Sequence, residues 1–195
     1  DIEHKAVTTQ TISLDSTVYS WSLGLMPAFL DAQGRPVDFD GEARIIEDEF
    51  WTDPVESNQD SESWNLVEWD SEPNRWRMAG PRIYVNNLGI RLVPTEGRAM
   101  LKSNLRAAGR SKAQAKTRSA SAGTSYTCDS TGRIALAEGI YFPKSDGFRM
   151  QKAQWTFYVP VGQSIRFDER LAPYLEETQV VGDFPIGELA GQRCI

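Results

Sequence analysis

The sequence has few of the side chains that enzymes and metal proteins most often use. Its 195 residues include one histidine, His4, and two cysteines, Cys128 and Cys194, which show no Cys-x-x-Cys spacing. It contains no Gly-x-Ser-x-Gly motif and no glycine-rich phosphate loop. A zinc site, a nucleophile activated by histidine and a nucleotide-binding loop therefore have no support. We expect a protein that is not an enzyme and uses no cofactor or metal.

Long apolar runs are also missing. No stretch of about 18 apolar residues occurs, so no segment is expected to cross a membrane. Residue 1 is Asp rather than Met, and we expect the chain to be cut from a longer precursor that carries a signal peptide or an anchor. Cys128 and Cys194 could form a disulfide in an oxidising compartment. The interpretation that we favour is two separate, small buried side chains.

Charge of one sign is scarce in one region of the chain and absent from another. Between Asp38 and Glu72 thirteen residues are acidic and only Arg44 is basic, whereas between Arg98 and Arg118 seven residues are basic and none is acidic. The net charge of -6 argues against a uniformly basic nucleic-acid binder, and we expect no nucleic-acid partner. Two solvated faces of opposite sign are the simplest interpretation. The alternative for the basic run is contact with anionic lipid headgroups.

Short strands dominate the rest of the pattern. They are rich in Thr, Val, Ile and aromatic residues with period-two alternation, and they are expected over residues 8–14, 17–23, 64–69, 83–85, 88–93, 98–105, 124–128, 133–137, 140–143 and 153–161. Asp15-Ser16 suggests that the first two strands form a hairpin or two consecutive rungs. Asn86-Asn87 predicts a tight turn, because Asn tolerates positive φ. One short helix is expected around 110–121, with Ser111 as its cap and an apolar face made of alanines.

The stretch QWTFYVPVGQSIRFDERLAPYLEE, residues 154–177, has the most regular pattern. Apolar residues occupy odd positions and are expected to face the core on both sides of the bend at Gly162, namely Ala153, Trp155, Phe157, Val159, Val161, Ile165 and Phe167. Asp168 and Glu169 follow this row. They predict the start of a turn or a helical cap rather than a catalytic pair.

These signals predict a single all-β domain over residues 1–195, built either as a repetitive β-solenoid or as a β-sandwich of short strands. An acidic excursion at about 38–73 is expected to run over its surface. Because this segment contains several tryptophans, it does not have the composition of a disordered acidic linker.

The excursion supplies the candidate interaction surface. Its members are aromatic and acidic side chains that occur close together in the sequence, namely Trp51, Trp64, Trp69, Glu47, Asp48 and Glu49. Carboxylates with neighbouring tryptophans line many sugar clefts, so a carboxylate-based hydrolase that uses these residues or Glu68 and Asp70 is an alternative. We favour the simpler interpretation, in which the tryptophans anchor a polar excursion.

A calcium loop is the other chemistry that this region suggests. Asp38, Asp40, Gly41 and Glu47 have the spacing of EF-hand ligand positions, but Pro36 occupies the first position and no helices flank the loop. A β-turn with solvated carboxylates is therefore expected.

Three segments carry a family resemblance: GIRLVPTEG at 89–97, GRSKAQAKTRSAS at 109–121, and YFPKSDGFRMQKAQWTFYVPVGQSIRFDERLAPYL at 141–175. With them, residues 82–193 resemble the extracytoplasmic C-terminal β-domain of phage-shock-protein-C-type (PspC-type) membrane proteins from Bacteroidetes, which is related to adhesin-like and toastrack β-domains. The acidic excursion does not fit this pattern.

The resemblance implies a toastrack-like all-β fold outside the cytoplasmic membrane, in the periplasm or at the cell surface. Its anchor would be a transmembrane helix missing from this chain. It implies a non-catalytic function, in which the domain binds or senses a partner, such as an envelope protein, in an envelope stress response. A partner could dock by strand addition at an exposed sheet edge. The alternative is an adhesin-like module that contacts a surface glycan or another cell. No catalytic residue is carried over.

Overall fold

The structure is a computed structural model that describes residues 4–26, 29–41, 44–45, 75–176 and 193–194. Strands dominate these ranges. In chain order the elements are β1 (His4–Ser13), β2 (Ser20–Leu25), β3 (Arg44–Ile45), β4 (Arg75–Ala79), β5 (Arg82–Val85), β6 (Leu88–Thr95), β7 (Met100–Gly109), α1 (Lys112–Ser121), β8 (Tyr126–Cys128), β9 (Arg133–Leu136), β10 (Ile140–Pro143), the 3-10 helix η3 (Lys144–Asp146), β11 (Lys152–Pro160), β12 (Ser164–Phe167), the 3-10 helix η4 (Glu169–Tyr174) and β13 (Arg193–Cys194). The predicted all-β class with one short α-helix is confirmed.

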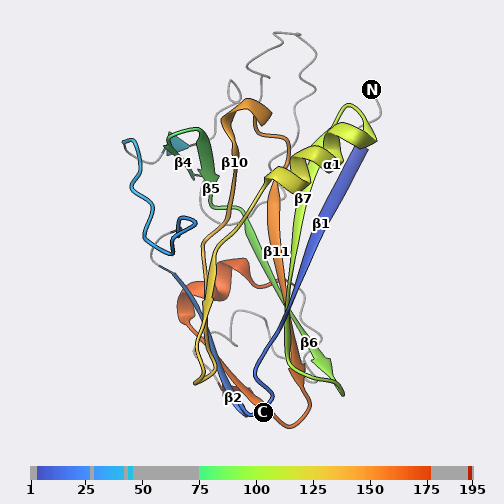
Figure 1. Ribbon diagram of the computed structural model, residues 1–195. Coiled ribbons are helices and arrows are strands. Elements are labelled where there is room, and N and C mark those ends of the chain that lie inside the picture. The colour runs from blue at the N-terminus through green and yellow to red at the C-terminus, as the bar shows by residue number, and fades with distance from the viewer. Residues whose placement is uncertain (1–3, 27–28, 42–43, 46–74, 177–192, 195) are drawn as a thin grey trace.

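The strands form three open sheets. The long sheet has the order β1-β7-β11-β6, the upper sheet β10-β5-β4-β3, and the lower sheet β13-β12-β2-β9-β8. In Figure 1 the long sheet runs down one side of the molecule, and the upper and lower sheets follow one another on the opposite side. Neighbouring strands are parallel at β6/β11 and at β12/β2/β9. Such pairs need crossover connections, which here carry the chain between sheets.

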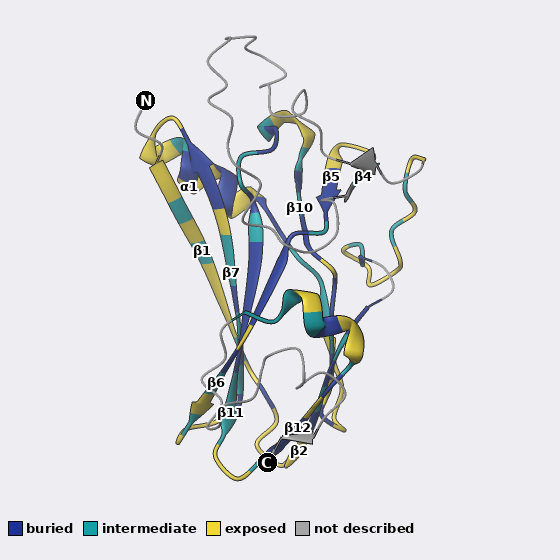
Figure 2. Cartoon of the chain, turned by 180° about the vertical axis from the view of Figure 1, so that it is seen from behind, coloured by how far each residue is buried: buried dark blue, intermediate teal, exposed yellow. Residues whose placement is uncertain are grey.

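The hydrophobic core lies between the sheets. In Figure 2 buried residues are drawn dark blue along the inner strands, whereas β1 is mostly yellow, as exposed. The predicted odd-numbered row supplies much of it: Trp155 and Phe157 on β11 are buried, as is Phe167 on β12. Trp21 of the lower sheet meets Phe157 edge to face, with ring centroids 5.5 Å apart. The prediction is wrong for Val161, which is 65% exposed. This residue lies in the turn after β11, where the chain leaves the long sheet.

The first predicted hairpin is wrong. β1 belongs to the long sheet and β2 to the lower sheet, so Asp15 and Ser16 link two sheets. The Asp15 carboxylate accepts hydrogen bonds from the backbone N–H and the hydroxyl of Thr17. This local turn allows Leu14 and Val18 to enter the core on either side of it.

The second predicted turn also links two sheets. β5 lies in the upper sheet and β6 in the long sheet, and among the described residues only Met150 has a positive φ outside glycine. Asn86 and Asn87 therefore do not adopt the expected left-handed conformation. Asn87 is buried, and its side-chain amide donates to the carbonyl of Gln151. Hydrogen bonding in the core explains this asparagine better than turn geometry does.

The predicted helix is confirmed as α1. The Ser111 hydroxyl accepts the N–H of Gln114 at 3.1 Å, as an N-cap residue does. The helix packs closely on the long sheet through Ala115, Arg118 and Ser119, whereas Ala113 and Ala120 are exposed, so the expected face made only of alanines is wrong. A Cβ atom added to Gly109 would lie 2.6 Å from the backbone nitrogen of Ala115. Arg118 is buried and donates to the carbonyl of Ala108. The basic run is thus divided between β7 and a helix, and one of its charges is buried.

The topology excludes a disulfide between the two cysteines within one chain. Cys128 lies on β8 and Cys194 on β13, which form opposite edges of the lower sheet. Four strand spacings separate the two edges, or about 19 Å, whereas a disulfide needs Cα atoms within about 7 Å. Cys128 is a free, exposed thiol, which contradicts the expectation that it is buried.

Candidate functional site

The interaction surface predicted from the sequence lies outside the described residues. This applies to Trp51, Trp64, Trp69, Glu47, Asp48 and Glu49, and to the alternative carboxylates Glu68 and Asp70. Within the described residues, no group of three or more His, Cys, Asp and Glu side chains is arranged to hold a metal ion. Of the calcium-like positions, Asp40 accepts a hydrogen bond from the N–H of Gly80 at 2.9 Å.

The most prominent binding feature of the described chain is the outer edge of β1. This strand pairs with β7 over all ten residues, from His4 opposite Gly109 to Ser13 opposite Met100. The sheet order places β1 at the end of the long sheet, without a described strand on its other side. In Figure 1 it forms the outer margin of the molecule. We call this margin the β1 edge.

Alternate residues of β1 form hydrogen bonds to β7, and this alternation decides which backbone groups of β1 face outward. The N–H of Leu14 donates to the carbonyl of Ala99, the position opposite it when the β1/β7 register is extended by one residue. In an antiparallel ladder, hydrogen-bonded and non-bonded pairs alternate. Even-numbered residues of β1 therefore bond to β7. The odd-numbered residues direct their N–H and C=O groups to the open edge, namely Lys5, Val7, Thr9, Thr11 and Ser13.

Side chains hold β1 in place without blocking its edge. On one face the hydroxyls of Thr8 and Ser119 of α1 lie 2.9 Å apart. On the other, the Thr9 hydroxyl donates to the side-chain oxygen of Asn104 on β7 at 2.8 Å. The strand contains no proline, glycine or acidic residue, and Lys5 is its one lysine. The usual devices that prevent strand addition are therefore nearly absent from β1.

The other sheet margins offer a partner strand fewer backbone groups, because they are short or already covered. β8 and β13 at the margins of the lower sheet are three and two residues long. At the far margin of the long sheet, β6 bridges to Leu175, and the N–H of Glu176 donates to the carbonyl of Ile90. Among the described residues, the β1 edge is thus the longest margin open to a partner strand.

The β6 margin of the long sheet is covered by the chain that follows η4. The Glu176 carboxylate crosses β6 above Gly89 and bonds to Lys152 and to the Gln154 amide on β11. The Arg106 guanidinium on β7 donates to the same Gln154 at 2.6 Å. A side chain at position 89 would occupy the path of the carboxylate. This polar network fixes the chain after η4 across three strands.

Residues 58–186 match the protein family described as "ToastRack found in some PspC". The chain belongs to this ToastRack family. The match begins inside the acidic excursion, so part of that segment fits the family after all. Comparison with curated proteins and with solved structures gave no match. The resemblance to PspC C-terminal regions is confirmed, while the Bacteroidetes source and the relation to adhesins stay predictions.

Membership indicates the general role of this ToastRack chain. The family is not a known enzyme family, and its association with PspC points to a non-catalytic domain related to envelope stress. It also points to an extracytoplasmic part of a membrane protein. No helix in the described part of the chain is long and apolar enough to cross a bilayer.

Sequence reasoning missed the β1 edge as a specific site, although a signal was present. The segment VTTQTIS contains polar residues at both odd and even positions, so neither face of the strand reads as fully buried. Such a strand is expected at a sheet margin. Period-two patterns alone do not identify which margin stays open.

Proposed function

We propose that this ToastRack chain is a non-catalytic, extracytoplasmic binding domain that captures an extended segment of an envelope protein along the β1 edge. A transmembrane helix outside this chain would anchor it, and binding would report envelope stress. The captured segment would add a fifth strand to the long sheet.

The proposal rests on the ten-residue strand β1, whose outer backbone donors and acceptors have no partner strand among the described residues. Strand addition satisfies such a ladder through main-chain hydrogen bonds, and alternate side chains then supply selectivity. Here the side chain of Val7 is 53% exposed beside the ladder and can contact an apolar residue of the partner. The edge needs no conformational change to accept a strand, because β7 and α1 already hold β1 straight.

Crosslinking in the native envelope tests this proposal. A photo-crosslinking amino acid replaces Val7 in the full-length protein, alone or together with Thr11→Pro or Thr11→Ala. Proline removes an outward N–H and leaves the β1/β7 ladder intact, which is where edge strands tolerate it. We expect one crosslinked protein, reduced at least tenfold by Thr11→Pro and retained by Thr11→Ala.

Circular dichroism of the purified variants verifies that Thr11→Pro remains folded. Equal crosslinking in the proline and alanine variants would contradict docking at the β1 edge. A further variant that lacks residues 47–72 separates this edge from the acidic excursion. If that deletion alone abolishes the crosslink, the excursion is the binding surface and the proposal is wrong.

A further inference from the structure

A row of hydrogen-bond donors crosses the solvent-facing side of the lower sheet. Arg166 of β12 lies opposite Ser22 of β2, and Ser22 lies opposite Arg133 of β9. All three strands run in parallel, so the three side chains point to the same face. The alternating partners Trp21 and Ile165 are buried in the core, which places the row on the outside. The two arginine Cα atoms are separated by two strand spacings, roughly 10 Å.

The row contains donors whose acceptors are missing within the described chain. Arg133 and Arg166 are exposed, and the structure shows neither guanidinium in an ion pair with a described carboxylate. The Ser22 hydroxyl is also without a described partner. At the end of the row, the Asp129 carboxylate accepts the hydroxyl of Thr131 at 2.6 Å. The same carboxylate accepts the backbone N–H of Arg133 at 3.1 Å, so turn bonds occupy its oxygen Oδ1.

The nearest carboxylate beyond the row is also occupied. Asp168 follows the end of β12, caps η4 and lies beside Gly24 of β2. Its two oxygens accept the Nε and Nη2 groups of Arg170 at 2.9 and 2.8 Å. Asp168 therefore neutralises Arg170 rather than Arg166.

An open hollow of about 420 Å³ lies over this row. Its lining consists of the row and adjoining residues, namely Ser20, Trp21, Ser22, Thr131, Arg133 and Arg166. The lining provides two guanidinium groups and several hydroxyls and no carboxylate. The Asp129 carboxylate lies near Arg133 but outside this lining: its pKa is lowered by the Thr131 hydroxyl, by the Arg133 N–H and also by the Arg133 charge. A ligand suited to the lining is anionic and offers more than one oxygen.

We infer that this arginine row is a binding site for a phosphate group. One guanidinium saturates the two oxygens of a carboxylate, whereas two guanidiniums and a hydroxyl between them suit the three terminal oxygens of a phosphate monoester. The phosphate could belong to a lipid headgroup or to a soluble compound. This site lies on another sheet than the β1 edge, so the two proposals can fail separately.

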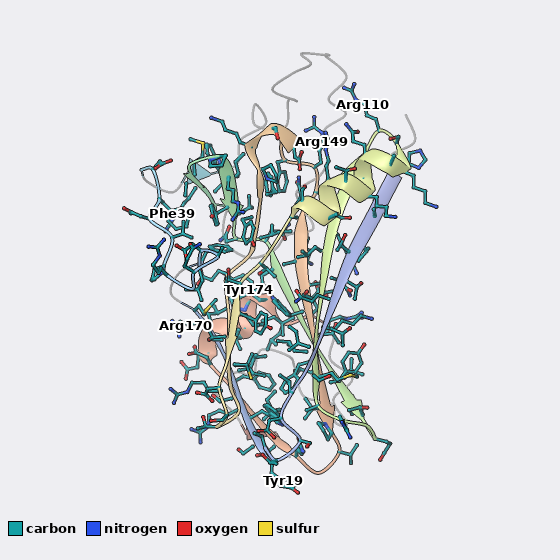
Figure 3. All side chains as sticks on the ribbon, in the orientation of Figure 1. Tyr19, Phe39, Arg110, Arg149, Arg170 and Tyr174 are labelled. Carbon is teal, nitrogen blue, oxygen red and sulfur yellow. The ribbon has the colours of Figure 1, made fainter. Side chains whose placement is uncertain are left out.

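Two exposed side chains lie at the end of the molecule next to the arginine row. They would contact a membrane if the phosphate belongs to a lipid headgroup. Tyr19, immediately before β2, is 73% exposed, and Val161, in the turn before β12, is 65% exposed. Figure 3 shows Tyr19 at the lower tip of the molecule. The carbonyl of Tyr19 accepts the N–H of Ser164, so the tip is joined directly to the strands that carry the row.

The experiment uses three probes on the whole chain: inorganic phosphate, vesicles of phosphatidic acid (a phosphate monoester) with phosphatidylcholine, and vesicles of phosphatidylcholine alone. Titration with phosphate is followed by NMR shifts of the lower sheet, and vesicle binding by cosedimentation. The variants are Arg133→Gln, Arg166→Gln and, as a matched control, Arg91→Gln, which changes an exposed arginine on β6 of the long sheet. Each row variant should weaken binding at least tenfold, and the control should bind like the wild type.

The outcomes distinguish the sources. Phosphate binding without vesicle binding assigns the site to soluble phosphate compounds. Binding to phosphatidic acid vesicles that depends on both row arginines assigns it to lipid headgroups. Failure of the wild-type chain to bind phosphate or anionic vesicles overturns the inference. Equal weakening by Arg91→Gln overturns it as well, because the attraction would then be general surface charge.

Discussion

Two tryptophans in the core differ in one hydrogen bond. Trp21 and Trp155 are both almost fully buried, at 1% exposure each. The indole N–H of Trp21 donates to the side-chain oxygen of Gln163 at 2.7 Å. The indole nitrogen of Trp155 has no hydrogen-bond partner among the described residues. A buried donor without a partner costs about 1–3 kcal/mol, so the two residues contribute differently to stability.

This difference predicts the result of two matched substitutions. Trp21→Phe removes a bonded donor and leaves the Gln163 oxygen unpaired, whereas Trp155→Phe removes a donor that costs free energy in the wild type. Both lose a similar volume. We expect Trp21→Phe to be more destabilising by about 1 kcal/mol. Urea unfolding of both variants measures the difference, and an equal or reversed order would contradict this account of the core.

Asp168, at the start of η4, contributes to the stability of the folded state in a way that depends on pH. Its carboxylate accepts the side chain of Arg170 and then the backbone N–H of Arg170, and these bonds lower the pKa of Asp168 to about 2. The pKa of an Asp side chain in the unfolded chain is about 3.9. The stabilisation is therefore fully present above about pH 5 and is lost as pH falls through the folded pKa.

Asp168→Asn tests this sign, because asparagine retains a capping oxygen without the charge. We expect the variant to be less stable by at most about 1 kcal/mol at neutral pH, since the ion pair is solvent-screened. The difference from wild type should shrink toward zero near pH 2. Urea unfolding at pH 7, 4 and 2 measures it, and a difference that does not change with pH would refute the assignment.

Among the elements, α1 depends on close contact with β7. A methyl group at Gly109 would meet backbone atoms of Ala115, which cannot move away without shifting the helix. A methyl group at Gly89 would instead meet the carboxylate of Glu176, the flexible end of a side chain. The same substitution therefore has different consequences at the two sites.

We expect Gly109→Ala to destabilise the fold by about 1–3 kcal/mol, as overpacking does. Gly89→Ala should cost less, because Glu176 can rotate away and lose only its bonds to Lys152 and Gln154. Gly97→Ala is the control, since its nearest contact is the Thr95 hydroxyl at 3.3 Å. Thermal unfolding ranks the three, and a larger loss at Gly89 than at Gly109 would contradict the proposed docking of α1.

For the whole molecule, local patterns predicted the elements but not their partners. The row through Trp155 and Phe157 and the Ser111 cap were predicted correctly, because alternation and capping are set by neighbouring residues. The hairpin predicted at Asp15-Ser16 and the left-handed turn predicted at Asn86-Asn87 were wrong. The chain crosses between sheets at these points, and crossovers depend on long-range pairing such as β11 beside β6, which no local signal encodes. The candidate site in the excursion lies outside the described residues and stays a prediction.

The strand order of the lower sheet also decides whether the two cysteines can form a disulfide. With β8 and β13 at opposite margins, Cys128 and Cys194 should not crosslink within a chain. Partial burial, with Asp129 and Asp15 nearby, raises the pKa of the Cys128 thiol and should slow its alkylation at neutral pH. Mass spectrometry of oxidised protein checks the first point. An intrachain disulfide in folded, monomeric protein would show that the sheet order is wrong.

Amide hydrogen exchange of the isolated chain reports whether the β1 edge is open. The N–H groups of even-numbered residues from Ala6 to Ile12 donate to β7, whereas those of odd-numbered residues from Lys5 to Ser13 point away from β7, where the described chain places no strand. We predict slow exchange at even positions and exchange at least a hundredfold faster at odd positions, because protection follows the backbone hydrogen bonds. Slow exchange at both sets in the monomeric chain would show that the edge is already covered and would contradict the account.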